Sequence, residues 1–171
     1  MKMKLLFLRS FLLVLITGLI LSSCKKDETK TEDIVGTWTT STSTFSAMVG
    51  SQTLTQYFIS EMGLSESDAA SYTLLFESFI EAAFTGTITV KSNGTYTSDL
   101  GGTADSGTWS LNADQTELTI TSGTDGPTTY DVIELTSSKL HLQVSETAPY
   151  DLNSDGIDEI LTIDIDISFT K

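Results

Sequence analysis

The chain has 171 residues, of which 39% are hydrophobic and 19% are charged, and this composition is typical of one globular domain. Its 23 acidic and 9 basic residues give a formal net charge of −14 at pH 7. Nucleic-acid binding requires lysine and arginine against phosphates, so the charge argues against it. A single cysteine excludes an intramolecular disulfide framework and a thiolate zinc cluster. A single histidine excludes a multi-histidine metal centre.

The first 24 residues have the layout of a secretory signal. Three basic residues, Lys2, Lys4 and Arg9, precede an apolar run of 11 residues at 11–21, whereas a transmembrane helix needs about 20. The run ends in Leu-Ser-Ser-Cys, which resembles a bacterial lipobox. The resemblance implies cleavage before Cys24 and acylation of its thiol, for example with palmitate. The alternative is an uncleaved signal anchor in which the cysteine has no role.

Loss of a signal peptide at residues 1–23 removes three positive charges and takes the net charge from −14 to −17. Anionic lipid repels so acidic a chain, so acyl chains on Cys24 would hold it at the membrane. Residues 25–33 are all polar, so 24–33 are predicted to be the lipidated cysteine and a flexible tether. This charged run, with lysine at position 25, resembles outer-membrane lipoproteins of Bacteroidota. The resemblance implies a lipid-anchored protein of the bacterial cell envelope, periplasmic or surface-exposed.

The domain at 34–171 is predicted to be all-β. Apolar residues alternate with threonine, serine and aspartate, most clearly at the C-terminus, and such alternation indicates strands with one buried face. Short turns join all neighbouring strands except the first two, which favours an eight-stranded antiparallel up-and-down barrel over the alternative, a two-sheet sandwich. Seven of the eight expected strands lie near 34–42, 85–91, 95–100, 107–111, 130–135, 140–144 and 161–170. The remaining strand, fifth in order, begins at residue 118.

Residues 46–84 lose this alternation and are predicted to form a helical hairpin inserted between strands 1 and 2. The first helix carries Leu54, Tyr57, Phe58 and Met62 at helical spacing and ends at Gly63. The second begins near Ser65 and carries a longer apolar stripe. We expect both stripes to cover an end of the barrel, because the segment lacks the lysine and arginine of a membrane-surface helix. The second stripe consists of Ala69, Tyr72, Phe76, Phe79, Ile80 and Ala83.

Several short motifs together resemble the small lipocalin-like domains of bacterial lipoproteins. They are Gly-Thr-Trp at 36–38, Ser-Asn-Gly-Thr-Tyr at 92–96, Gly-Thr-Trp-Ser-Leu at 107–111 and Leu-Thr-Ser-Ser-Lys-Leu at 135–140. The resemblance implies a calycin-like barrel in which Gly36 allows a close approach and Trp38 plugs the closed end. Lipocalins commonly place an arginine over this tryptophan. The chain has none after residue 9, which leaves Lys171 or Phe169 as a partial substitute.

An eight-stranded barrel is either filled by its own side chains or holds one small ligand. Our first hypothesis is non-catalytic binding of a small neutral or apolar ligand. The alternative is a solid barrel that acts as a structural or interaction module for another envelope protein or a glycan. An enzyme is the weakest hypothesis. Nothing in the sequence singles out two carboxylates as the catalytic pair of a glycosidase, and His141 is predicted to face solvent. The residues predicted to line a cavity are Ile88, Tyr96, Trp109, Leu118, Leu142, Ile163 and Ile165.

An acidic segment at 151–159 resembles the first half of an EF-hand calcium loop. Oxygen-bearing side chains recur at every second position and are followed by a glycine. Thr162 stands where the bidentate glutamate of an EF-hand belongs, and strand residues follow in place of a helix. Two interpretations stay open: a calcium site that rigidifies the last hairpin, or an acidic turn. The predicted ligands are Asp151, Asn153, Asp155, the Ile157 carbonyl, Asp158 and Glu159.

Overall fold

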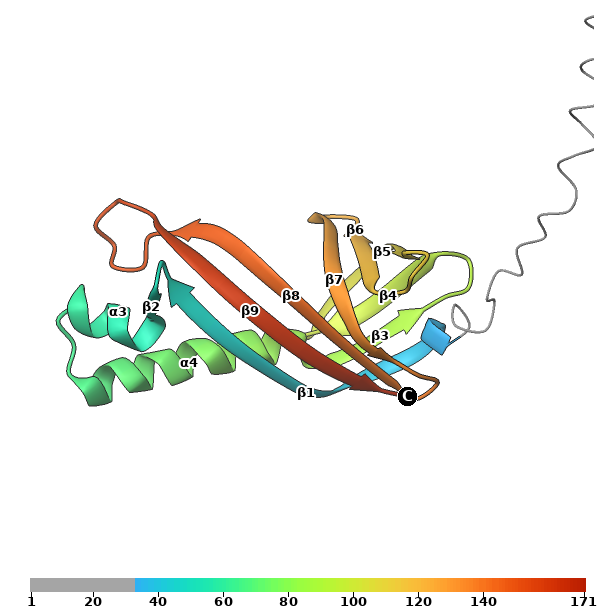
Figure 1. The fold of residues 1–171 in the computed structure, drawn as a ribbon, viewed down its shortest axis with the longest axis horizontal. Coiled ribbons are helices and arrows are strands. Elements are labelled where there is room, and N and C mark those ends of the chain that lie inside the picture. The colour runs from blue at the N-terminus through green and yellow to red at the C-terminus, as the bar shows by residue number, and fades with distance from the viewer. Residues whose placement is uncertain (1–32) are drawn as a thin grey trace, which may run out of the picture.

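Eight antiparallel strands close into a barrel in the computed structural model, which describes residues 33–171 (Figure 1). Each strand pairs with the next, and pairing between β1 and β9 closes the sheet, so the predicted barrel is confirmed over the sandwich. The predicted signal peptide, Cys24 and the tether up to residue 32 lie outside the described residues. The barrel strands are β1 (Gly36–Val49), β3 (Gly86–Val90), β4 (Thr95–Leu100), β5 (Thr103–Leu111), β6 (Glu117–Ser122), β7 (Gly126–Leu135), β8 (Lys139–Tyr150) and β9 (Glu159–Thr170).

Strands β1, β8 and β9 continue beyond the short strands as a three-stranded arm (Figure 1). Pairing between β1 and β9 runs from Thr39 opposite Thr170 to Val49 opposite Leu161. The predicted end of the first strand near residue 42, and the start of the helical segment at 46, are therefore wrong. Strand β1 continues because β9 offers a pairing edge along its whole length. A two-residue strand, β2 (Gln52–Thr53), then folds back onto β1.

The predicted helical hairpin follows β2 and consists of α3 (Leu54–Ser60) and α4 (Glu66–Phe84). A capping box formed by Thr53 and Gln56 starts α3. The Ser65 hydroxyl accepts a hydrogen bond from the Asp68 N–H at 3.2 Å and starts α4. Both helix starts therefore satisfy backbone N–H groups that have no partner within the helix.

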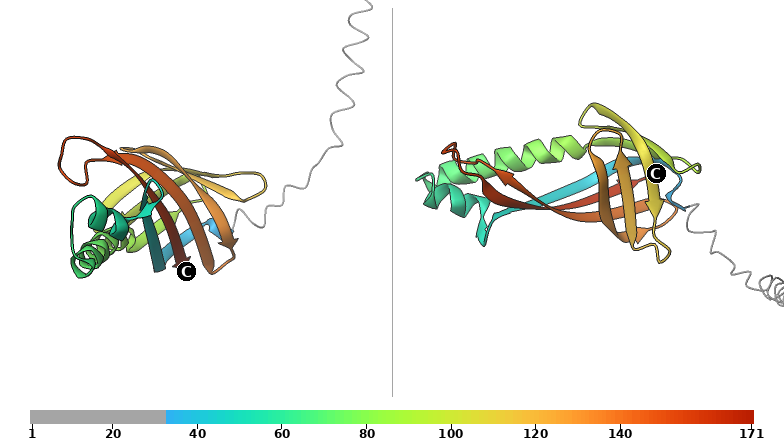
Figure 2. Two further views of the ribbon diagram at one scale, coloured as in Figure 1. Left: turned by 60° about the vertical axis from the view of Figure 1, so that its left-hand side comes forward. Right: turned by 90° about the horizontal axis from the view of Figure 1, so that it is seen from above.

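The hairpin packs against the arm and not across a barrel end, which corrects our expectation. Both views in Figure 2 place the helices beside the long strands. A small core joins them, whereas Trp38 and Leu118 belong to a separate core inside the barrel. Only the last residue of α4, Phe84, reaches the barrel cavity. The core beneath the hairpin consists of Ala47, Leu54, Tyr57, Phe58, Ala69 and Leu161.

Helix α4 has two apolar faces, and only one of them is covered. Ala69 is fully buried and Phe76 is half-buried against the arm. Tyr72, Leu75 and Phe79 are 56%, 66% and 77% exposed. The predicted single stripe is thus split, because a straight helix resting on a narrow arm can bury only one side. Within residues 33–171, no helix is both long and apolar enough to cross a membrane.

Candidate functional site

The Gly-Thr-Trp motif lies at one end of the barrel, called here the closed end. The Trp38 side chain is completely buried, and its Nε1 donates a hydrogen bond to the Ile34 carbonyl at 2.7 Å. The Lys171 ammonium lies 4.4 Å from the centre of the tryptophan ring, a cation–π distance. Lys171 Nζ also donates to the Asp33 carbonyl at 2.6 Å, so it joins the two ends of the described chain across the tryptophan.

Gly36 makes room for this lysine. Its φ of +145° is a conformation that favours glycine, and a Cβ at this position would lie 2.6 Å from Lys171 Cε. The close approach that the motif implied is therefore made by the C-terminal lysine. Of the two residues considered as a substitute for an arginine, Lys171 and not Phe169 places a cation over the Trp38 ring.

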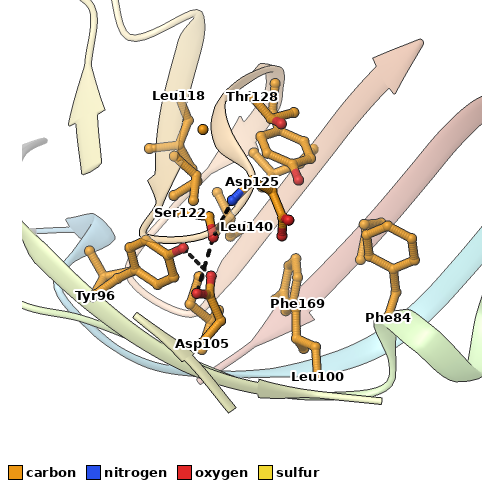
Figure 3. A pocket seen from close by; sticks show the side chains of 17 residues that line it. Phe84, Tyr96, Leu100, Asp105, Leu118, Ser122, Asp125, Thr128, Leu140 and Phe169 are labelled. Atoms are coloured by element: carbon orange, nitrogen blue, oxygen red, sulfur yellow. Dashed lines mark hydrogen bonds between the residues drawn. The ribbon is translucent and has the colours of Figure 1, made fainter. Parts of the chain in front are cut away.

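A cavity of about 200 Å³ occupies the barrel between this end and the C-terminus of α4 (Figure 3). Apolar side chains dominate its walls, because the apolar residues of each strand alternate with polar ones and face the barrel interior. At the far end, the mouth, Leu100 ends β4 and Asp125 stands in the turn between β6 and β7. The lining residues are Phe84, Ile88, Val90, Tyr96, Leu100, Asp105, Leu118, Ile120, Ser122, Asp125, Gly126, Thr128, Tyr130, Leu140, Leu142, Ile167 and Phe169.

Four of the seven residues predicted to line a cavity do so: Ile88, Tyr96, Leu118 and Leu142. The other three lie elsewhere. Trp109 donates from Nε1 to the Lys91 carbonyl at 2.9 Å, close to the turn between β3 and β4. Ile163 and Ile165 pair with the part of β1 that lies in the arm, opposite Ala47 and Phe45. The alternation of apolar and polar residues predicted the correct face of β9 for both isoleucines. However, β9 extends beyond the cavity into the arm, and both isoleucines lie in that extension.

A polar group of three side chains interrupts the apolar wall near the mouth. The Tyr96 hydroxyl donates a hydrogen bond to Asp105, and the Ser122 hydroxyl donates to Asp105 Oδ1 at 3.1 Å (Figure 3). Tyr96 is buried and Asp105 is half-buried. The Tyr96 hydroxyl is the main reason that the pKa of Asp105 is lowered, so the carboxyl is ionised at neutral pH. Burial, reinforced by Asp105, raises the pKa of Tyr96, which stays protonated.

Strand register and one glycine place this group. Tyr96 on β4 is opposite Gly107 on β5, which in turn is opposite Ser122 on β6. Asp105 is two residues from Gly107 and therefore on the same face of β5. A Cβ on Gly107 would lie 3.0 Å from Tyr96 Cε1 and 1.9 Å from the Thr121 carbonyl oxygen. Glycine thus lets the tyrosine ring cross the strand toward the carboxylate.

The sequence interpretation missed Asp105 and Ser122 as site residues, although the signal was present. Asp105 continues the inward row of Gly107, Trp109 and Leu111, and Ser122 continues that of Leu118 and Ile120. A carboxylate on an inward-facing row is the observation that would have indicated a polar site.

The acidic loop at 151–159 connects β8 to β9 at the tip of the arm, far from the cavity (Figure 1). Its carboxylates accept hydrogen bonds from the loop's own backbone. Asp151 accepts from the N–H groups of Asp155 at 3.1 Å and Gly156 at 3.0 Å, and Asp155 accepts from Ile157 at 2.8 Å. Asn153 accepts from the Asp155 N–H at 2.9 Å, and Ile157 and Asp158 are exposed.

Glu159 closes this loop on itself, and its carboxylate lies near the helical hairpin. Its carboxylate accepts from the Leu152 N–H at 2.9 Å. The Tyr57 hydroxyl is buried and has no hydrogen-bond partner among the described residues, and burial, together with the nearby Glu159, raises the pKa of Tyr57 to about 12. No three His, Cys, Asp or Glu side chains in the described chain are arranged to hold a metal ion. Calcium binding by this loop stays a prediction.

His141 faces the outer surface of the sheet. Its Nε2 lies 2.7 Å from Asp166 Oδ1, and Gln143 donates to the other oxygen of the same carboxylate at 2.7 Å. These contacts with Gln143 and His141 lower the pKa of Asp166. Ser168 on β9 is the strand partner of His141, but no hydroxyl within residues 33–171 makes a hydrogen bond to the imidazole.

The closed end, the cavity and its polar group define a small antiparallel β-barrel with a mostly apolar interior. No protein-family model matches the chain, and no curated protein is significantly similar to it. It is similar to a DUF4847 family protein from Bacteroides vulgatus ATCC 8482, known from a crystal structure at 1.00 Å resolution. The two are 18% identical with a TM-score of 0.39, and the match covers 82% of this chain and 96% of that chain.

Proposed function

We propose that this protein is a non-catalytic component of the bacterial cell envelope that binds a small neutral or apolar ligand inside a lipocalin-like barrel. The observation that carries the proposal is the cavity of about 200 Å³ and its mostly apolar wall. An apolar protein cavity of roughly 150 Å³ binds benzene, so this one has room for a ring with a short substituent. The size argues against a long acyl chain.

The proposal includes a lipid anchor on Cys24 at the outer membrane, supported by the lipobox-like Leu-Ser-Ser-Cys. The described chain starts at Asp33, whose carbonyl accepts from Lys171 beside Trp38. The tether predicted at residues 24–33 would therefore join the barrel at its closed end.

Native mass spectrometry of residues 25–171, purified without detergent, tests the ligand hypothesis. This segment should fold, because both cores and every strand pairing of the barrel lie within 33–171. An added mass that solvent extraction releases as a small molecule would support a ligand carrier. A bare mass, unchanged after incubation with envelope lipid extracts, would contradict it.

One observation favours the alternative function, an interaction module for another envelope protein. The uncovered face of α4 forms a shallow groove of aromatic and aliphatic side chains. The only charged side chains in the C-terminal half of α4 are Glu77 and Glu81. The fitting partner is therefore a protein that presents an apolar ridge bordered by lysine or arginine. The groove consists of Phe58, Tyr72, Leu75, Phe76 and Phe79.

Crosslinking from α4 in intact cells tests this alternative. A photoreactive residue at Leu75, which lines the groove, should give one adduct of defined mass. The matched control is Leu74, which is 65% exposed but lies outside the groove. Equal adducts from both positions, or none from either, would contradict a specific protein partner.

A further inference from the structure

We infer that the cavity selects a ligand that carries a protonated amine at one end and a compact apolar group at the other. This inference rests on the proposed ligand-binding function and revises its ligand class: in place of a neutral or wholly apolar molecule, the cavity would take an apolar molecule with one cationic end. It follows from the polar group at Asp105, from the second carboxylate at the mouth, and from the side chains that line the rest of the cavity.

The first step concerns charge. Asp105 and Asp125 both line the cavity, and the described lining residues include no lysine, arginine or histidine. The two groups that donate to Asp105, the hydroxyls of Tyr96 and Ser122, are neutral. The carboxylate is thus hydrogen-bonded without being neutralised. A ligand carboxylate would meet uncompensated negative charge here, whereas a ligand cation would provide the missing counter-charge.

The second step concerns hydrogen-bond capacity. An ionised carboxylate has about four acceptor positions on its two oxygens. Tyr96 uses one on Oδ2 and Ser122 uses one on Oδ1. Capacity therefore remains for a further donor. An ammonium group has three N–H donors, and its hydrogen bonds to carboxylates are about twice as strong as bonds between neutral groups.

The third step concerns the opposite end of the ligand. Figure 3 shows Phe169, Leu100 and Phe84 to the right of Asp105 and Ser122, and Phe84 is the farthest of the three from this polar group. Leu118 and Leu142 add aliphatic wall deeper in the barrel. Such a surface binds an uncharged ring or short branched chain through burial alone. The cavity volume limits that part to about the size of a benzene ring.

Four probes of nearly equal size test the inference: benzylamine, benzyl alcohol, toluene and benzoate. Binding is measured by NMR titration of the folded domain at pH 7. We expect benzylamine to bind about tenfold more tightly than benzyl alcohol, toluene to bind more weakly still, and benzoate not to bind. Asp105→Asn should remove the tenfold preference for the amine and leave toluene binding unchanged.

Two further variants keep the test decisive. Asp114→Asn removes one exposed carboxylate in the turn between β5 and β6, away from the mouth, and should leave all four affinities unchanged. If Asp105→Asn fails to fold, Asp125→Asn takes its place, because Asp125 is exposed and lines the same cavity. It should weaken benzylamine binding severalfold and leave toluene binding intact.

The outcomes separate the inference from the function on which it rests. Toluene or benzyl alcohol binding as tightly as benzylamine would overturn the amine class and leave the ligand-binding function standing. Amine preference that survives both Asp105→Asn and Asp125→Asn would also overturn it. Failure of all four probes to bind at millimolar concentration would overturn the proposed function itself, and the inference with it.

Discussion

Replacing Tyr96 with phenylalanine removes one hydroxyl and keeps the ring in place. The hydroxyl donates to Asp105, and Tyr96 is only 2% exposed. A hydrogen bond to a charged group contributes about 1.5–3 kcal/mol. Asp105 is half-buried, so water can replace part of the lost bond. We therefore expect Tyr96→Phe to lower the free energy of unfolding by about 1–2 kcal/mol at pH 7.

The loss should depend on pH in a defined direction. The Tyr96 hydroxyl is the largest cause of the lowered pKa of Asp105. A carboxyl with a lowered pKa in the folded state stabilises the fold above its ordinary pKa of about 3.9, and this contribution disappears as the pH falls through the folded-state value. In Tyr96→Phe the folded-state pKa of Asp105 moves back toward the ordinary value. The difference between the two proteins should therefore be largest at neutral pH and shrink below about pH 4.

Urea denaturation followed by the fluorescence of the two tryptophans measures both effects. Tyr72→Phe is the matched control, because Tyr72 is 56% exposed and its hydroxyl makes no hydrogen bond within the described chain. Its unfolding free energy should stay within about 0.5 kcal/mol of the wild-type value. Equal stability of Tyr96→Phe and wild type at pH 7 would refute the reasoning. So would a loss of the same size at pH 7 and pH 3, since that would indicate packing and not the carboxylate bond.

Three further changes test the closed end, the cavity wall and the acidic loop. Gly36→Ala should lower the unfolding free energy by about 1–3 kcal/mol in urea, because its φ of +145° is strained for alanine and Lys171 must move. Gly102→Ala, at φ +72° with no neighbour within 4 Å, measures the backbone strain alone. Leu118→Ala, at a buried wall position, should cost about 2–5 kcal/mol and let the cavity accept a larger probe in NMR titration. The calcium hypothesis predicts heat on titration with millimolar calcium that Asp155→Ala abolishes; no heat, or unchanged heat in the variant, would contradict it.

The barrel could be predicted because the residues that define each strand and each turn are adjacent in the sequence. Each strand alternates apolar and polar residues, and short turns such as Asn93-Gly94 force neighbours to pair. Closure between β1 and β9 then follows from the number of strands and the apolar row on each. The cap that starts α4 was also a local signal, since Ser65 needs only the residues that follow it.

The arm could not be predicted because it depends on a long-range pairing. Residues 43–49 carry Phe45, Ala47 and Val49 at alternate positions, but helical spacing begins directly after them. Only the presence of β9 along the same edge decides that this stretch continues as a strand. The same long strands move the hairpin away from the barrel end and leave Phe79 uncovered. They also explain why Ile163 packs in the arm and not in the cavity.

The polar group at the mouth is the feature that barrel packing does not require. Tyr96, Gly107 and Ser122 form one row across three strands, and this row becomes visible only when the register is known. Asp105 lies beside this row, and the lowered pKa of its carboxyl means that the hydrogen bonds to the ionised form, that from Tyr96 above all, outweigh the cost of its desolvation. An apolar residue at position 105 would leave the buried Tyr96 hydroxyl without its acceptor, so the tyrosine and the carboxylate depend on each other. What the barrel's own residues leave open is the charge: no cationic side chain among the described lining residues faces this carboxylate, and a cationic ligand is the group that would supply the counter-charge.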